Sequence, residues 1–151
     1  GANRYQFVHA ADLADACLRA ADRPGATTYN VGAMEFGTMR ETLTALVEHA
    51  RTGSRVRSLP VAPAKAVMAS LARIGLAPFA PYHWLLYSES LYFDTTKAQR
   101  ELGWSASYSN AEMVIESYEW FLEHRDTLGH EGSHHQSPVR PGLVRLLKLL
   151  P

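Results

Sequence analysis

The 151-residue chain contains almost no cysteine, carries no net charge and lacks any long apolar run. Its one cysteine, Cys17, excludes an internal disulfide and is typical of a reducing compartment. Basic and acidic side chains number 15 each, so the overall charge gives no electrostatic reason to bind nucleic acid. No apolar stretch reaches the roughly 18 residues that a membrane span needs, and no signal peptide is recognised. We therefore expect a cytoplasmic protein without a nucleic-acid partner.

Two motifs of dinucleotide-dependent enzymes are also absent. No G-x-G-x-x-G or G-x-x-G-x-x-G sequence follows a strand-like segment, so we expect no cradle for a pyrophosphate. No tyrosine stands four residues before a lysine: Lys65, Lys97 and Lys148 are preceded at that distance by Val61, Phe93 and Val144. A Tyr-x-x-x-Lys pair on one helix face lowers the pKa of the phenol for proton transfer. This chain lacks that device.

What the sequence does contain is an alternation of strand-like and helix-like segments. With 46% hydrophobic residues, a chain of this length can bury the core of one ordinary domain. Aromatic and β-branched content predicts strands at residues 4–9, 27–31, 55–59 and 91–93. Helix-like segments with short connections lie between them, which predicts an α/β layer structure.

Helix ends are marked clearly within residues 1–125. Thr38-x-x-Glu41 and Ser109-x-x-Glu112 are capping boxes, and each predicts a helix that begins there. Another helix is predicted over 63–74, ended by Gly75, and another after Asp12. The predicted apolar stripe of the helix near Asp12 is Leu13, Ala14, Cys17, Leu18 and Ala21, so Cys17 is expected to be a buried apolar side chain.

Residues 91–104 combine a strand, a helix and an anchor. Asp94 is suited to cap the helix that follows the strand. Ala98 and Leu102 stand four apart on one helix face. Gly103 is the residue type that most readily adopts the left-handed conformation at a helix end, and Trp104 is expected to anchor the exit.

The last 26 residues differ in character from residues 1–125. Residues 126–138 are rich in Gly, Ser and His and predict a solvated linker, and His130, His134 and His135 in it are expected to be solvated rather than to bind a metal. Residues 141–151 predict a short basic leucine-rich helix that either docks on its own domain or a partner subunit, or lies weakly on a membrane. The chain starts at Gly1 rather than Met, which suggests a processed, tagged or excised chain.

Three stretches, in order, carry a family resemblance. Residues 7–16, Phe-Val-His-Ala-Ala-Asp-Leu-Ala-Asp-Ala, resemble an F-V-H-V-x-D-x-A-x-A segment. Residues 29–32, Tyr-Asn-Val-Gly, resemble a Y-N-[IV]-G strand end, and residues 94–104 resemble the late D-x-x-K-A-x-x-E-L-G-W motif. All three are similar to segments of the extended short-chain dehydrogenases/reductases, the NAD-dependent epimerase/dehydratase family.

The resemblance implies the carboxyl-terminal part of such an enzyme. The implied fold is α/β: the last sheet strands of a Rossmann-type extended short-chain dehydrogenase plus a small, mainly helical substrate-binding domain. NAD or NADP would bind the full-length enzyme and not this chain alone, because the glycine-rich site and all catalytic residues would lie in a missing N-terminal Rossmann portion. The isolated chain is then expected to be an inactive fragment of an oxidoreductase or epimerase. A stand-alone, non-catalytic binding module derived from that fold is the alternative, and a homo-oligomer stays open.

Family members that act on nucleotide sugars carry arginines at two places where this chain has Tyr5 and Trp84. Neither aromatic can make the bidentate contact of a guanidinium with phosphate. We therefore expect a small-molecule substrate that is flatter or more apolar than a nucleotide sugar. The candidate substrate-binding residues are Tyr5, Phe7, His9, Tyr82, His83, Trp84 and Tyr87.

Each candidate also has a purely structural interpretation. A locally hydrogen-bonded His9 is favoured over a general base, because no carboxylate partner is identifiable in the sequence. For Asp12 a role at the helix start is favoured over a catalytic acid. The aromatic segment 77–90, predicted as a loop, either lines a pocket or fills a core, and Tyr5 and Phe7 share that ambiguity.

Overall fold

The computed structural model describes residues 1–75, 80–86 and 88–126. The chain divides into a first unit, Gly1–Glu119, and a second unit, Trp120–Pro151. The described part of the second unit is residues 120–126, where the Trp120 ring stacks on His124 with centroids 4.4 Å apart. The predicted linker and the leucine-rich tail lie outside the described residues. No helix among the described residues is long and apolar enough to cross a membrane.

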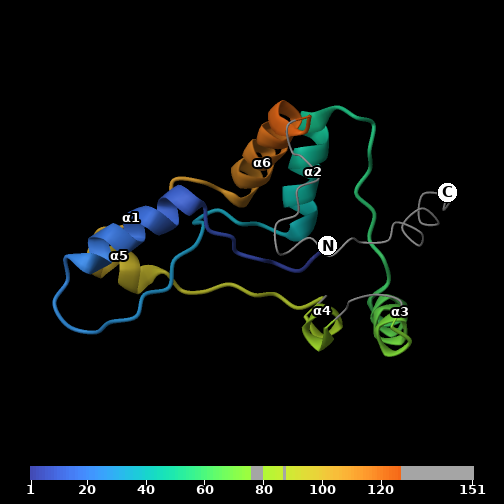
Figure 1. Ribbon diagram of the computed structural model, residues 1–151, viewed down its shortest axis with the longest axis horizontal. Helices are drawn as coiled ribbons and strands as arrows, with labels where there is room; N and C mark the ends of the chain where they lie inside the picture. The colour runs from blue at the N-terminus through green and yellow to red at the C-terminus, as the bar shows by residue number, and fades with distance from the viewer. Residues whose placement is uncertain (76–79, 87, 127–151) are drawn as a thin grey trace. The chain divides into compact units, whose positions relative to one another are not determined.

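Helices dominate the described residues (Figure 1). They are α1 (Ala10–Ala21), α2 (Met39–Ala50), α3 (Val61–Arg73), α4 (Pro81–Leu85), α5 (Thr96–Leu102) and α6 (Asn110–His124). The sequence predicted all of these except α4, which forms inside the predicted aromatic loop. Within the first unit α1 packs on α5, and α3 packs on α4.

The predicted sheet is absent from residues 1–75, 80–86 and 88–126, so the predicted α/β fold class is wrong for the part of the chain that the structure describes. One isolated parallel bridge joins Tyr5 to Leu91, and these residues contain no strand. The segments predicted as the last sheet strands of a Rossmann-type enzyme are instead connections between helices. The first unit is therefore helical, with irregular segments running between its helices.

The reason lies in what bonds to these segments. Leu91 exchanges main-chain hydrogen bonds with Arg4 and Gln6, at 2.8 and 3.1 Å, but the ladder does not continue. The Gln6 side chain instead donates to Ala33 O at 2.8 Å and accepts from Phe93 N at 2.8 Å. A side-chain amide thus fills positions that a neighbouring strand would fill. Strand propensity describes how well a residue fits into a sheet. It does not produce a sheet where no neighbouring backbone continues the hydrogen-bond ladder.

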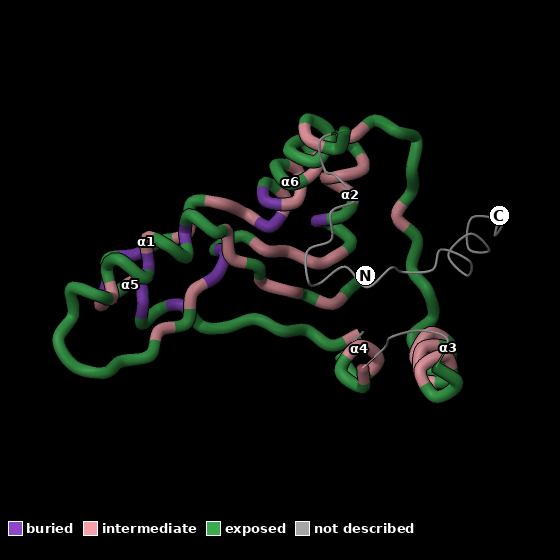
Figure 2. The backbone as a smooth tube through the Cα atoms, viewed as in Figure 1, coloured by how far each residue is buried: buried purple, intermediate pink, exposed green. Residues whose placement is uncertain are grey.

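The core of the first unit forms where α5 meets α1 (Figure 2). Trp104, two residues beyond the end of α5, belongs to it. Ala98 and Trp104 are 0% and 1% exposed, and Leu102 and Ala16 complete the buried cluster. Gly103 ends α5 with φ +60°, in the left-handed region, and directs the chain so that Trp104 turns inward. The predicted roles of Ala98, Leu102, Gly103 and Trp104 are confirmed.

The buried face of α1 is not the predicted one. Leu13 and Leu18 are 42% and 71% exposed, and Cys17 is exposed rather than buried. Asp12 and Ala16 face inward instead. The polar side chains of α1 set this orientation, because the Arg19 guanidinium donates to Gly103 O at the end of α5 and the Asp12 carboxylate accepts from Ser107 N before α6. Alanines on the inner face also let the two helices approach closely.

Both capping boxes are confirmed. Thr38 Oγ1 accepts from Glu41 N at 3.2 Å while the Glu41 carboxylate accepts from Thr38 N at 2.7 Å, and Ser109 and Glu112 repeat this pattern at 3.2 and 2.7 Å. Hydrogen bonds from the backbone N–H and hydroxyl of Thr38 lower the pKa of Glu41 below its usual 4.5. The same two bonds from Ser109 lower the pKa of Glu112.

These lowered pKa values predict a loss of stability in acid. A carboxylate whose folded pKa lies below its unfolded value stabilises the fold above the unfolded pKa, near 4.5. That stabilisation disappears as the pH falls through the folded pKa. We expect the double variant E41Q/E112Q to be less stable than the parent at pH 7 and to show a shallower decline below about pH 4.5, measured by urea unfolding between pH 3 and 7. E48Q, on α2 but outside the box, is the control, and an unchanged decline in the double variant would contradict this assignment.

Candidate functional site

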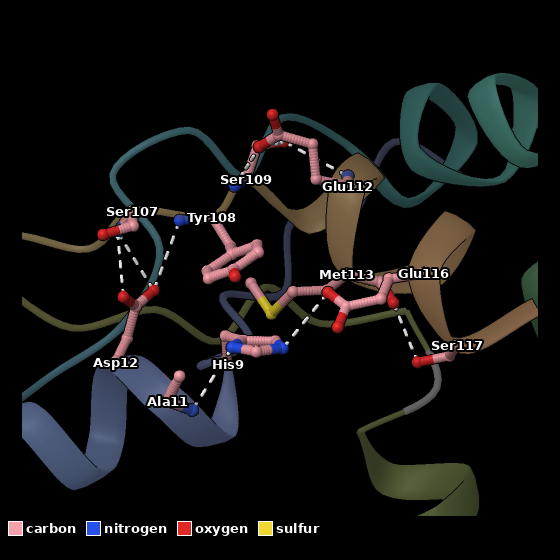
Figure 3. Close-up of polar contacts among 10 residues, drawn as sticks. All are labelled: His9, Ala11, Asp12, Ser107, Tyr108, Ser109, Glu112, Met113, Glu116 and Ser117. Carbon is pink, nitrogen blue, oxygen red and sulfur yellow. Dashed lines mark hydrogen bonds and ion pairs between the residues drawn. The ribbon is translucent and has the colours of Figure 1, made fainter. Parts of the chain in front are cut away.

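Two places in the first unit gather chemically capable side chains. The first, the His9 cluster, consists of His9, Asp12, Tyr108 and Glu116 (Figure 3). The second is a cavity beside Arg40, which we call the Arg40 cavity.

His9 occupies the N-cap of α1. Its Nδ1 accepts a hydrogen bond from Ala11 N at 3.2 Å, and its Nε2 lies 3.2 Å from Glu116 Oε2 on α6. The imidazole also stacks on Tyr108, with centroids 3.9 Å apart. This pattern assigns the proton of the neutral ring to Nε2, where it is donated to the carboxylate. Both ring nitrogens are then engaged. The sequence offered no carboxylate partner for His9, but the structure supplies Glu116, so the preference for a local role over a general base stays a prediction.

Asp12 is buried, at 5% exposed, and holds the loop before α6. Its carboxylate accepts from Ser107 N at 3.0 Å and from Tyr108 N at 3.3 Å. Its main-chain carbonyl accepts from Trp104 Nε1 at 2.9 Å. A carboxylate bound by backbone N–H groups in this way joins the start of α1 to the segment after α5. The His9 cluster therefore connects α1 to α6 and to the loop before α6, and backbone N–H groups bind its buried carboxylate.

The Arg40 cavity has a volume of about 360 Å³ and is partly open to solvent. Its walls come from the start of the chain through Tyr5, from the first turns of α2, from residues between 56 and 61, and from Ser88. Arg40 and Arg57 both line it, and its lining contains no acidic side chain among the described residues. Arg40 Nη2 donates to Ser58 Oγ across the cavity wall.

Of the predicted substrate-binding residues that the structure describes, Tyr5 is the one that lines this cavity. Its hydroxyl donates to Leu86 O at 2.7 Å, just past the end of α4. Phe7 is 36% exposed, and its main-chain N–H donates to Asn110 Oδ1 at 3.1 Å. His9 lies in the other cluster.

The aromatic residues of α4 form a separate group. Tyr82 is 59% exposed and stacks on His83, with centroids 4.0 Å apart. His83 Nδ1 accepts from Ala80 N at 2.9 Å, which caps this short helix. Trp84 is half-buried, and Tyr87 lies outside the described residues. The structure thus connects Tyr5 to the end of α4, and the role of the predicted residues in binding substrate stays a prediction.

Sequence reasoning did not identify several residues of these two places. Asn110 is 1% exposed and joins three parts of the first unit, yet in sequence it is an ordinary first residue of a helix. Glu116 gives no signal because its partner, His9, is 107 positions away. Arg40 and Arg57 are surface-type residues, and only tertiary contact places them on one cavity. The described residues contain no group of three side chains that could hold a metal ion, and the three tail histidines lie outside them.

Comparison with known proteins finds two relatives. The chain is 51% identical over 149 residues to the uncharacterized protein y4nG of Sinorhizobium fredii (strain NBRC 101917 / NGR234), covering 97% of this chain and 37% of that protein. It is 25% identical over 134 residues to the UDP-glucose 4-epimerase GEPI42 of Cyamopsis tetragonoloba, covering 85% of this chain and 31% of that protein. No protein-family profile and no solved structure matches it. The chain spans about a third of the length of these relatives, and over most of its own length it is similar to an epimerase.

Proposed function

We propose that the chain is the substrate-binding, carboxyl-terminal portion of an NAD(P)-dependent epimerase, dehydratase or reductase. The similarity to a UDP-glucose 4-epimerase over 85% of the chain supports this proposal. That protein is about three times as long as the matched region, which agrees with the expectation that the cofactor site and the catalytic residues belong to another portion.

One observation carries the proposal furthest. The three motifs that resemble the dehydrogenase family contact one another in the first unit. Tyr29 Oη donates to Glu101 Oε2 at 3.2 Å, and Asn30 Nδ2 donates to Asp94 O at 3.4 Å, which connects the second motif to the third. The first motif packs on the third, since Ala16 lies in the same buried cluster as Trp104. Residues that resemble the family are thus also the residues that hold this unit together.

Side chains already occupy three of the helix N-termini at which the described residues could hold the pyrophosphate of a dinucleotide. A pyrophosphate needs backbone N–H groups at an unobstructed helix N-terminus. At α2 and α6 that place holds the carboxylates of Glu41 and Glu112, and at α1 it holds the His9 imidazole. The Glu41 and Glu112 carboxylates would repel a pyrophosphate, and the His9 ring already accepts the Ala11 N–H, whereas α3 begins without a side-chain cap. We therefore assign no hydride-transfer step to this chain, and its contribution is to position substrate and exclude water.

The proposed substrate is flatter or more apolar than a nucleotide sugar. Tyr5 and Trp84 stand where arginines would grip a diphosphate, and the Tyr5 hydroxyl is already bonded to Leu86 O. The Tyr82 ring on α4 is available for apolar contact, since Tyr82 is 59% exposed. Displacement of a bound substrate by UDP-sugars in the complete enzyme would contradict this part of the proposal.

Calorimetric titration tests the proposal. We expect the 151-residue chain to bind none of NAD⁺, NADH and NADP⁺. A longer protein that continues in frame upstream of Gly1 is expected to bind one of them with a stoichiometry of about one per chain. Stoichiometric binding by the 151 residues, or no binding by the longer protein, would contradict the proposal. A start codon directly before Gly1 would favour the stand-alone binding module instead.

A further inference from the structure

We propose that α3 and α4 carry a surface that lies on an anionic membrane, with its apolar side chains among the lipid chains and its positive charge at the headgroups. We call this surface the α3–α4 face. It consists of large exposed apolar side chains of the two helices and of the residue that follows each helix: Val61, Val67, Ile74, Tyr82, Leu85 and Leu86. The inference does not use the proposed enzyme function, so each can fail without the other.

The two helices have no core of their own. α3 packs on α4 (Figure 1), yet none of the residues Val61–Arg73 and Pro81–Leu85, all of which the structure describes, is buried. Figure 2 shows exposed and half-buried residues along both helices. The side chains of the α3–α4 face are between 41% and 64% exposed. Apolar surface of this kind is stabilised when an apolar phase covers it.

The length and pattern of α3 are those of a helix that lies in a membrane surface. α3 has 13 residues, whereas a membrane span needs about 20. Val67 and Ile74 stand seven positions apart, which places them on the same side of the helix at a distance of two turns. Arg73, next to Ile74, is exposed and can extend its charged end toward lipid headgroups while its aliphatic stem stays near the apolar layer. This combination is typical of interfacial helices.

The charge of this part of the chain favours anionic lipid. No acidic residue occurs between Glu48 and Glu89, whereas the same stretch contains Arg51, Arg55, Arg57, Lys65 and Arg73. Acidic and basic side chains number 15 each in the whole chain, so this positive excess is local. Lys65 pairs with Glu89, at 3.3 Å, but Arg73 pairs with no acidic side chain of the described residues. Anionic headgroups attract positive charge of this kind.

α4 contributes an aromatic side chain suited to the boundary between water and lipid. Tyr82 is 59% exposed and has an apolar ring with a polar hydroxyl at its end. Tyrosine and tryptophan are enriched at membrane interfaces for this reason. Leu85 follows Tyr82 by one turn and is 60% exposed, so the two side chains share one side of α4.

A second copy of the chain fits this face less well. A symmetric contact brings the same surface from both partners, so it would place a second positively charged helix pair against the first. Like charges brought together oppose association. An anionic lipid surface covers the same apolar side chains and also compensates the positive charge.

Co-sedimentation of the 151-residue chain with vesicles tests this inference. One set of vesicles contains phosphatidylcholine alone, and in the other about 30% of the lipid is phosphatidylglycerol. We expect the chain to bind the anionic vesicles at least about tenfold more tightly than the neutral ones, and less tightly as salt is added. Failure to bind the anionic vesicles, or equal binding to both sets, would overturn the proposal.

Variants of the α3–α4 face separate its apolar and its charged parts. V67S/L85S should weaken binding to the anionic vesicles by about tenfold or more. R73Q should weaken it by about fivefold and leave binding to the neutral vesicles unchanged. Val67, Leu85 and Arg73 are exposed, so these variants should keep the helix content of the parent by circular dichroism.

Two variants outside the α3–α4 face serve as controls. L18S removes a leucine of α1 that is 71% exposed, and R23Q removes an exposed arginine just past the end of α1. Both should leave vesicle binding within about twofold. Losses in L18S equal to those in V67S/L85S, or in R23Q equal to those in R73Q, would contradict a specific surface.

Two further measurements distinguish other occupants of the α3–α4 face. Sedimentation equilibrium of the chain without lipid should show no self-association that V67S/L85S abolishes, because such a result would assign the face to a second copy. A longer protein that continues in frame upstream of Gly1 should bind the anionic vesicles as the 151-residue chain does. If the longer protein did not bind them, the remainder of the protein would cover this face and the proposal would fail.

Discussion

Replacing Trp104 by alanine is expected to lower the free energy of unfolding by about 3–5 kcal/mol. The Trp104 side chain is 1% exposed and packs among Ala16, Ala98 and Leu102. Alanine would leave a large cavity in this small core, and it would remove the hydrogen bond from Nε1 to Asp12 O at 2.9 Å. Because domains of this size are stable by only about 5–15 kcal/mol, this loss is a large fraction of the whole. Urea unfolding followed by circular dichroism measures it.

Two further variants separate packing from hydrogen bonding at this position. W104F keeps most of the ring volume but loses the indole N–H, so its cost should be smaller than that of W104A by about 2 kcal/mol. W120A removes a tryptophan that is 51% exposed and should cost less than about 1 kcal/mol. Similar losses in W104A and W120A would show that Trp104 does not hold the core.

Replacing Asn110 by alanine is expected to cost about 3 kcal/mol or more. Its Oδ1 accepts from Phe7 N at 3.1 Å, and its Nδ2 donates to Tyr5 O at 2.6 Å and to Phe36 O at 3.1 Å. Asn110 itself is 1% exposed, so alanine would leave three main-chain groups without these partners in a place that water reaches poorly. Faster hydrogen exchange of the Phe7 amide should accompany the loss in unfolding free energy.

A matched control for Asn110 is Asn30. Asn30 is exposed, and its Nδ2 donates to Asp94 O over a long distance of 3.4 Å. We expect N30A to cost less than about 1 kcal/mol and to leave exchange of the Phe7 amide unchanged. If N110A were as mild as N30A, the Asn110 amide would not be replacing the neighbouring strand that the Tyr5 and Phe7 main chain lacks.

Local chemistry made several features predictable. The capping boxes of α2 and α6, the left-handed end of α5 at Gly103 and the inward turn of Trp104 all depend on residues within a few positions of one another. Short-range hydrogen bonding and backbone preference decide such features, so a sequence pattern is sufficient to find them.

The orientation of α1 was not predictable in this way. Its apolar stripe predicted that Leu13 and Leu18 would be buried, yet the Asp12 and Arg19 side chains fix the helix by bonding main chain of residues 102–108. Such bonds join residues more than 80 positions apart in sequence. Helical periodicity reports which residues share a face, but it does not report which face finds a partner.

The candidate site shows the same limit. Tyr5 was identified from its position in a motif, whereas Arg40 and Arg57 had no local feature that distinguished them from other surface arginines. Their common cavity exists because residues 1–5, α2 and residues 56–61 meet in space. A binding site built from three separate segments leaves no fixed spacing in the sequence.

By itself the sequence determined that five of the described helices form, which residues anchor the end of α5, and that neither a glycine-rich pyrophosphate loop nor a Tyr-x-x-x-Lys pair is encoded in these 151 residues. Only the tertiary structure decided that the strand-like segments form no sheet among the described residues, that Asn110 and Gln6 supply the missing partners, and that two arginines share a cavity. The physical reason is the distance in sequence between the residues that interact. Caps and helix ends depend on bonds between near neighbours, whereas a sheet or a cavity depends on which distant groups become available to complete it.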